Sequence, residues 1–135
     1  MTPKLIKTVY IPKSAYKGFQ NKANEFYQVM KLSLDSELWS GVGLNAVHCV
    51  ISLNDALTAY FLNKRFSGED HRHASELLAQ VPCEDAKQYA NAFSKIISKK
   101  HMVAYEEREF RRSEALEIDK QTERFYRWGV SKLSA

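Results

Sequence analysis

A long and almost continuously apolar segment dominates the pattern of hydrophobic and polar positions along this chain. Between Ser36 and Arg65, apolar side chains occupy most of the circumference of a helix, a pattern typical of a helix buried on nearly all sides. Polar residues interrupt it at helical spacing, and we call them the polar stripe: Asn45, His48, Ser52 and Asp55. Residues at this spacing lie along one edge of a helix. The pattern therefore predicts a central helix within residues 36–65 that gives way at Lys64 and has one narrow polar edge.

The segment before the central helix predicts an extended arm followed by a long helix. Two prolines within residues 1–13 favour extended backbone over a helix. Ser14 is a suitable N-cap, and apolar positions then recur at helical spacing as far as Leu34. The pair Asp35 and Ser36 predicts a tight break, so the central helix should return antiparallel to the first helix.

Two glycines lie in the first turns of the expected central helix. Gly41 and Gly43 each cost about 1 kcal/mol relative to Ala in a helix interior. They predict either close packing of the first two helices or a helix that begins only near Leu44.

The second half of the chain predicts three more helices. Ser67 and Asp70 fit the Ser-x-x-Asp pattern that caps a short helix. Another helix is expected to begin near Glu84, because apolar positions recur from there at helical spacing. The charged segment 106–112 favours a solvated turn or an exposed helical segment, after which Ser113 is placed to cap the last helix.

Length and composition agree with one small helical domain. A chain of 135 residues is long enough to bury a stable core without disulfides or a bound metal. We therefore expect a single domain over residues 1–135, with an all-α fold that is an up-and-down bundle of four main helices plus a short helix. The 20 Lys and Arg residues outnumber the 16 Asp and Glu residues, for a net charge of +4. Because the two signs are interleaved, this charge is compatible with nucleic-acid binding without requiring it.

The cysteines and the apolar runs bear on the cellular setting. Cys49 and Cys83 lack the spacing of a disulfide framework or a zinc site, and we expect both to be buried and reduced. No apolar run approaches the roughly 20 residues that span a bilayer, and the start of the chain lacks the apolar centre of a signal peptide. We expect a cytoplasmic protein without a metal or a cofactor.

Five short motifs, taken in order, resemble one known family. They are Asn45-Ala-Val-His48, Asp55-Ala-Leu, Gly68-Glu-Asp-His71 with Leu77-Leu78, Val103-Ala-Tyr105-Glu106, and Phe125-Tyr-Arg-Trp128. Their order and spacing resemble the HEPN domains (higher eukaryotes and prokaryotes nucleotide-binding), which are small helical bundles. The resemblance covers most of the chain, from the first long helix to the last.

The resemblance implies either ribonuclease activity or a binding role. Many HEPN proteins are metal-independent ribonucleases, often toxins silenced by a nucleotidyltransferase partner, and others serve without catalysis in RNA binding, partner binding or dimerisation. The ribonucleases carry an Arg, then four to six residues, then a His that is commonly followed two residues on by a Tyr. If Tyr105 is that Tyr, Val103 occupies the His position and Ser98 lies near the Arg position. The resemblance therefore implies a member with a degenerate ribonuclease motif.

Cleavage of RNA without a metal needs a base for the ribose 2′-hydroxyl and a cation for the phosphate. The candidates are His48, Asp55, Arg65, His71 and Tyr105. Arg65 lies six residues before His71 and meets the loose family spacing, although it falls between the second and third helices; the alternative is that Arg65 solvates a helix end and His71 helps to cap the next helix. Asp55 is a candidate to orient His71. The alternative is a polar seam with a purely structural role.

A second candidate set is basic. It could bind RNA phosphates, and it consists of Lys99, Lys100, Arg108, Arg111 and Arg112. A solvated, charged face explains the same residues, because acidic residues are interspersed among them. His73 follows His71 by two residues and so points elsewhere on a helix, which favours a surface position over a shared metal site.

Two hypotheses about function follow. In the first, the chain is a non-catalytic HEPN-like module that dimerises or binds a partner such as a nucleotidyltransferase. In the second, it binds RNA or cleaves it without a metal, as toxin-type members do, through the His, Asp and Tyr candidates. Trp39, Tyr126 and Trp128 favour a homodimer, because a small bundle does not readily cover three large aromatic side chains.

Overall fold

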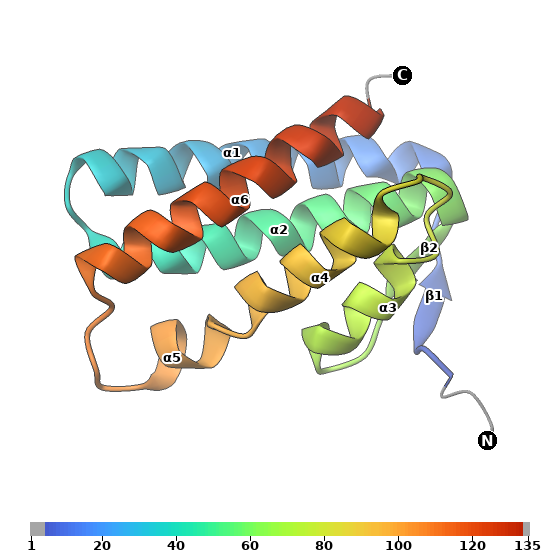
Figure 1. Ribbon diagram of the computed structural model, residues 1–135. Coiled ribbons are helices and arrows are strands. Elements are labelled where there is room, and N and C mark those ends of the chain that lie inside the picture. The colour runs from blue at the N-terminus through green and yellow to red at the C-terminus, as the bar shows by residue number, and fades with distance from the viewer. Residues whose placement is uncertain (1–4, 134–135) are drawn as a thin grey trace.

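Four long helices that alternate in direction form the body of the protein (Figure 1). The computed structural model describes residues 5–133. The helices are α1 (Tyr16–Asp35), α2 (Trp39–Leu62), α4 (Ala86–Ile97) and α6 (Arg112–Leu133). Two shorter helices, α3 (Ala74–Leu78) and α5 (Lys100–Tyr105), lie along one edge. The predicted all-α bundle of four main helices is confirmed, and α5 is an addition to it.

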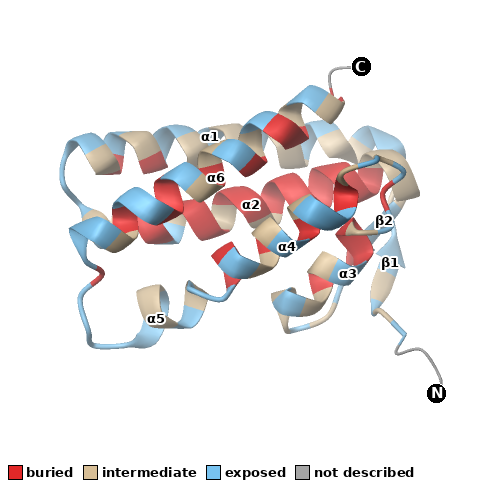
Figure 2. Cartoon of the chain, in the orientation of Figure 1, coloured by how far each residue is buried: buried red, intermediate tan, exposed pale blue. Residues whose placement is uncertain are grey.

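Helix α2 lies at the centre, as its sequence predicted. Its side chains are buried along most of its length, whereas α1, α4 and α6 each keep one exposed face (Figure 2). Leu53 and Leu57 are both fully buried. Burying such a side chain contributes about 1.5–3 kcal/mol. Helix α2 therefore holds the other three long helices in place.

The central helix ends just before Lys64, as the sequence predicted. Asn63 adopts a left-handed backbone conformation with φ 54°, which stops α2 after Leu62. The chain then continues as strand β2 (Lys64–Phe66), which pairs antiparallel with strand β1 (Thr8–Tyr10) and places Val9 opposite Arg65. The extended arm is thus confirmed over β1, while its first residues, 1–4, lie outside the described residues. The sequence placed Arg65 just past the end of the central helix, and the structure places it in a strand because it pairs with the distant β1.

The two glycines of α2 are explained by close packing. Helix α2 already begins at Trp39, so the later start near Leu44 is ruled out. A Cβ added at Gly41 would lie 3.1 Å from Ser33 Oγ of α1, which is tighter than ordinary van der Waals contact. At Gly43 a Cβ would lie 2.9 Å from Val103 Cγ2 of α5 rather than against α1. The first glycine therefore admits α1, and the second admits α5.

Helix starts differ from their predicted caps. Ser14 lies inside a 3-10 turn, η1 (Lys13–Ala15), and α1 begins after it without a side-chain cap. Ser113 falls within the first turn of α6 instead of before it. Asp70 does act as a cap, since its carboxylate accepts a 3.0 Å hydrogen bond from the Arg72 amide at the start of η2 (His71–His73). The Ser67 amide instead donates to the Lys7 carbonyl beside β1.

None of the helices within residues 5–133 is long and apolar enough to cross a membrane.

Candidate functional site

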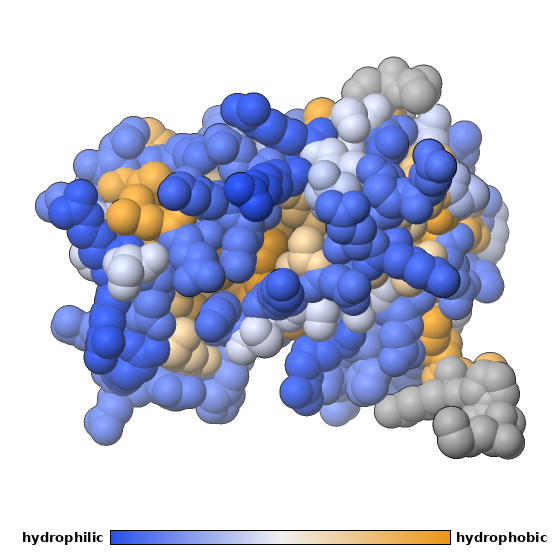
Figure 3. Space-filling model, viewed as in Figure 1, coloured by the Kyte–Doolittle hydropathy of each residue, from blue (hydrophilic) through white to orange (hydrophobic). Residues whose placement is uncertain are grey.

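A hollow opens where η2 faces the end of α4 and the start of α5, and we call it the η2–α5 hollow. Its volume is about 540 Å³. The space-filling view shows a notch at the lower edge of the molecule between α5 and α3 (Figure 3). The lining residues come from both sides of the hollow: Glu69, Asp70, His71, Arg72, Ile97, Ser98, Lys100, His101 and Tyr105. Two of the candidates from the sequence, His71 and Tyr105, therefore meet here, together with Lys100.

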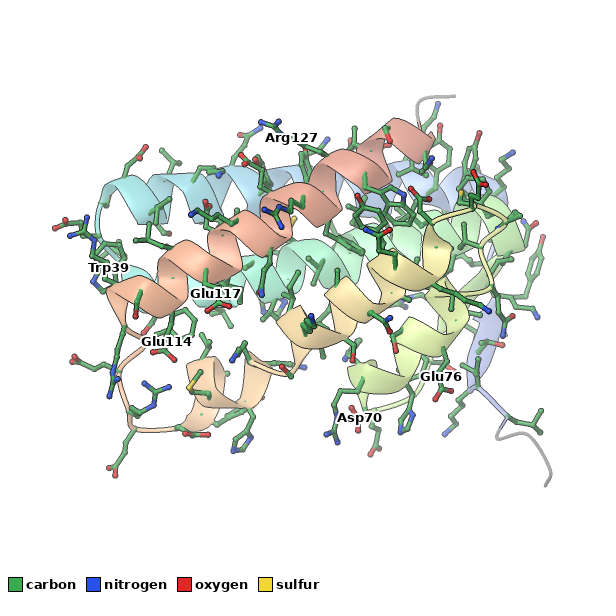
Figure 4. All side chains as sticks on the ribbon, viewed as in Figure 1. Trp39, Asp70, Glu76, Glu114, Glu117 and Arg127 are labelled. Atoms are coloured by element: carbon green, nitrogen blue, oxygen red, sulfur yellow. The ribbon has the colours of Figure 1, made fainter. Side chains whose placement is uncertain are left out.

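One of the two acidic residues that line the hollow, Asp70, is paired with its neighbour Arg72. The Arg72 Nη2 atom donates a 2.8 Å hydrogen bond to Asp70 Oδ2, and Arg72 Nε contacts both carboxylate oxygens at 3.1 Å. These bonds hold the pKa of Asp70 well below its usual range. Asp70 lies at the lower end of η2 (Figure 4). Its carboxylate is thus engaged, so it opposes an incoming anion less than a free carboxylate would.

His71 presents an imidazole whose inner nitrogen has no partner. Its Nδ1 atom is buried and forms no hydrogen bond within the described part of the chain. The ring lies 5.8 Å from the Phe66 ring, centroid to centroid. Burial lowers the pKa of His71 below 6.5, and the positive charges of Lys100 and Arg65 lower it further. The surroundings of His71 therefore favour its neutral form.

His48, on α2, belongs to the same electrostatic group. Burial is the main cause that lowers its pKa, and Lys100 is the second. Its ring packs against Phe26 of α1, with 5.4 Å between ring centroids. Lys100 thus acts on two imidazoles, His48 and His71, that come from different elements. Lys100 and His71 line the hollow, and His48 lies close enough to both to affect the pKa of His71 and to be affected by Lys100.

Asp55 pairs with Arg65. The Arg65 Nε atom donates to Asp55 Oδ2 at 3.2 Å, and the guanidinium lies 5.3 Å from the centre of the Phe19 ring. Burial raises the pKa of Asp55 to about 6, although Arg65 and Lys22 oppose the shift. No hydrogen bond joins Asp55 to His71 among the described residues, so the expected carboxylate-to-imidazole contact is replaced by a carboxylate-to-guanidinium contact. Arg65 reaches His71 only through its electrostatic effect.

The polar stripe of α2 divides into two roles. Asn45 donates from Nδ2 to the Gly41 carbonyl at 2.8 Å, so its side chain is bonded within its own helix. Ser52 is buried, and Asp55 positions Arg65. Only His48 interacts electrostatically with the residues of the hollow. The structure thus gives Asn45 and Asp55 partners within the protein, and both alternatives for the stripe stay predictions.

Tyr105 stands at the outer edge of the hollow. Its side chain is 73% exposed, and its ring centroid lies 5.6 Å from that of His101. An exposed aromatic ring beside an imidazole offers a surface on which a nucleobase can stack.

The predicted basic patch is not one surface. Arg108 donates to both oxygens of Glu114, at 2.8 and 3.0 Å, and also contacts Met102 Sδ. The Arg112 guanidinium lies at the start of α6, 6.0 Å from the centre of the Trp39 ring. Lys99 faces a separate small depression on the far side of the turn. Of the five predicted RNA-binding residues, Lys100 alone lines the hollow, and exposed Arg111 does not.

Arg72 and Ser98 are lining residues that the sequence did not suggest. The sequence indicated Ser98 only as the position where the family's Arg would stand, and it did not indicate Arg72. No local pattern marks either residue, because η2 and α5 become neighbours only through packing on α2 and α4.

No metal site accompanies the hollow. Within residues 5–133, no group of three or more His, Cys, Asp or Glu side chains is placed to hold a metal ion. Cys49 is buried in α2, where burial raises the pKa of its thiol to about 12. Cys83 is also free but only half-buried, so the prediction that both cysteines are buried is wrong for Cys83.

Comparisons with known proteins add no relative: no family model, no curated protein and no solved structure matches this chain.

Proposed function

We propose that this protein is an HEPN-like helical module that binds single-stranded RNA through the η2–α5 hollow without cleaving it. The observation that carries the proposal is the gathering of Lys100 and two imidazoles, His48 and His71, beside a hollow of about 540 Å³. A hollow of this size lies within the range of pockets that hold small ligands or single nucleotides. Lysine supplies a charge for phosphate, and Tyr105 supplies a ring for a base.

The same geometry gives little support to catalysis. A metal-independent ribonuclease needs a correctly oriented base and a free cation at the phosphate. Here Asp55, the carboxylate expected to orient an imidazole, holds Arg65 instead, and Asp70 at the hollow is bonded to Arg72. The family's expected Arg and His positions carry Ser98, whose hydroxyl donates to the Lys95 carbonyl, and Val103, which packs near Gly43. These features favour binding without cleavage.

The test is RNA binding by a matched pair of variants. Lys100→Ala removes the lysine that lines the hollow, while Lys99→Ala removes its neighbour that faces elsewhere. With single-stranded RNA at a fixed salt concentration, we expect Lys100→Ala to weaken binding on the order of tenfold, or about 1.4 kcal/mol. We expect Lys99→Ala to bind as the wild type does. Equal losses in both variants, or none in either, would contradict the proposal.

A cleavage assay distinguishes the two RNA hypotheses. We expect no cleavage above background in the absence of metal. Robust cleavage that is lost in His71→Ala and kept in Lys99→Ala would instead make Arg65 and His71 a catalytic pair.

Self-association is a second candidate, supported by exposed leucines rather than by the aromatic residues. Trp128 is 6% exposed and stacks on Tyr89, so the bundle covers it, and Tyr126 is half-buried against Tyr27. Leu32 and Leu116 are exposed at the end where α1 finishes and α6 begins, where Figure 3 shows a hydrophobic patch. Analytical ultracentrifugation at micromolar concentration tests the homodimer. A clean monomer would count against it.

The cellular setting stays a prediction. A nucleotidyltransferase partner, a toxin–antitoxin role and a cytoplasmic location come from the family resemblance and from the sequence. An adjacent nucleotidyltransferase gene would favour the toxin-type setting.

A further inference from the structure

A second depression lies on the face between α4 and α6, and we call it the α4–α6 groove. Its volume is about 390 Å³. Gln88, Asn91 and Lys95 line it from α4, and Gln121 and Arg124 line it from α6. No acidic side chain is among the described residues that line it. It is therefore a basic groove without a built-in counter-charge.

The two cations of the groove come from opposite walls and are unpaired. Neither Lys95 nor Arg124 forms an ion pair within residues 5–133, and both are exposed. Arg127, on the same helix, differs: it lies 3.7 Å from Glu123 and projects from the edge of α6 nearest α1 (Figure 4). Unpaired cations that face a common groove favour a phosphate backbone, which releases counterions when it binds.

The remaining lining groups suit nucleobases. The carboxamides of Gln88, Asn91 and Gln121 each carry both donors and acceptors, so they can pair with the edge of a base. Tyr89 lies against the groove with its ring held parallel to Trp128, at 4.3 Å between centroids and an angle of 6°. This stack fixes the tyrosine, so the wall needs no ordering when a ligand binds.

Residues that line the groove and the η2–α5 hollow lie along one face of α4. Gln88, Asn91, Lys95 and Ser98 follow one another at helical spacing, and Ser98 lines the hollow. The Ser98 hydroxyl donates to the Lys95 carbonyl at 2.6 Å, and these two residues, one from each depression, lie within one helical turn. Ten residues of helix advance about 15 Å. A chain bound in the hollow can therefore extend along α4 without leaving polar surface.

We infer that the α4–α6 groove is a second subsite for single-stranded RNA, in which a strand held in the hollow continues along α4, with Lys95 and Arg124 at its phosphates. This inference rests on the proposed function and adds the length and direction of the binding track. It assigns roles to residues that lie outside the hollow.

The test measures affinity against strand length. Oligouridines of about 4 and about 12 nucleotides bracket the site sizes common for single-strand binders. We expect the wild type to bind the longer strand about tenfold more tightly. Lys95→Ala and Arg124→Gln should lose most of this gain while they bind the short strand as the wild type does. Each should also reduce the slope of log affinity against log salt by about one for the long strand.

The matched control is Arg127→Gln, because it makes the same change one helical turn away, at an arginine already paired with Glu123. It should keep the gain with length. Equal wild-type affinity for both strands, or unchanged length dependence in Lys95→Ala and Arg124→Gln, would overturn the inference and leave the proposed function standing, provided that Lys100→Ala still weakens binding. If the wild type bound no RNA at all, both the inference and the proposed function would be overturned. Arg124-dependent binding of an oligoglutamate peptide, without any length effect of RNA, would assign the groove to an acidic protein partner instead.

Discussion

The two sides of helix α6 differ in whether their charged residues are paired within the protein. On the side that faces α1, Lys31 Nζ lies 3.0 Å from Asp119 Oδ1 and 3.2 Å from Glu123 Oε1. The Tyr27 hydroxyl donates to Glu123 at 3.1 Å, and its ring stacks on that of Tyr126 at 4.0 Å. On the side that faces α4, Lys95 and Arg124 have no such partners within the described residues.

This difference separates structure from function along one helix. Charges that the fold pairs internally hold α1 against α6, and they have little left to offer a ligand. Charges that the fold leaves unpaired contribute little to stability. Even an exposed ion pair contributes only about 0–1 kcal/mol, and Lys95 and Arg124 form no ion pair among the described residues. The α1 side should therefore respond to mutation in stability, and the α4 side in binding.

The largest effect should come from the helix beneath both sides. Leu57 is fully buried in α2, so Leu57→Ala should lower the free energy of unfolding by about 2–5 kcal/mol. Denaturant unfolding measures it. Leu32→Ala on α1, where the side chain is 64% exposed, is the control and should change stability by less than about 0.5 kcal/mol. A small effect at Leu57 would mean that α2 is not the centre of the bundle.

The central position of α2 was predictable because its evidence is local. Apolar residues all around one helix need no knowledge of the rest of the chain. The strand at Arg65 shows where local evidence fails, because it forms by pairing with Val9, which is distant in the sequence. A left-handed Asn63 ends the helix just before Lys64, where the apolar pattern also stops.

The candidate site was predictable in its members more than in its contacts. His71 and Tyr105 do line one hollow, and Lys100 joins them. The partner of Asp55 was missed, because helical spacing shows which residues share an edge and not which distant side chain reaches them. Composition likewise could not distinguish Arg108, which Glu114 neutralises, from Lys100, which no acidic residue in the described chain contacts.

A smaller effect should sharpen the comparison between the two sides of α6. Asp119→Ala removes the carboxylate that binds Lys31 on the α1 side, and we expect a loss of about 1–2 kcal/mol in unfolding free energy with unchanged RNA affinity. Arg124→Gln on the α4 side should do the reverse, with a stability change below about 0.5 kcal/mol and weaker binding of long RNA.

Glu117→Ala serves as the control for Asp119→Ala, because it removes an exposed carboxylate from the same helix (Figure 4). It should leave stability nearly unchanged. If Arg124→Gln destabilised the fold as much as Asp119→Ala does, the division between the two sides of α6 would not hold.

The smallest effect concerns pH and the hollow. The pKa of His71 lies below 6.5 because of burial and of Lys100 and Arg65, while Asp70 opposes the shift and His48 adds to it. These causes favour the neutral imidazole, which gains a proton as the pH falls, and a bound phosphate should favour that proton. Linkage then requires RNA affinity to rise as the pH falls, by about two- to tenfold between pH 7.5 and 5.5. Oligouridine is the probe, since its bases do not titrate in this range. Asp55, whose pKa is about 6, loses negative charge over the same pH range and adds to the effect, so a part of the pH dependence should survive in His71→Ala.

His73→Ala is the matched control, because that ring lies beside Asp70 and Glu76 and does not line the hollow. A pH dependence that is the same in His71→Ala and His73→Ala would remove His71 from the binding surface.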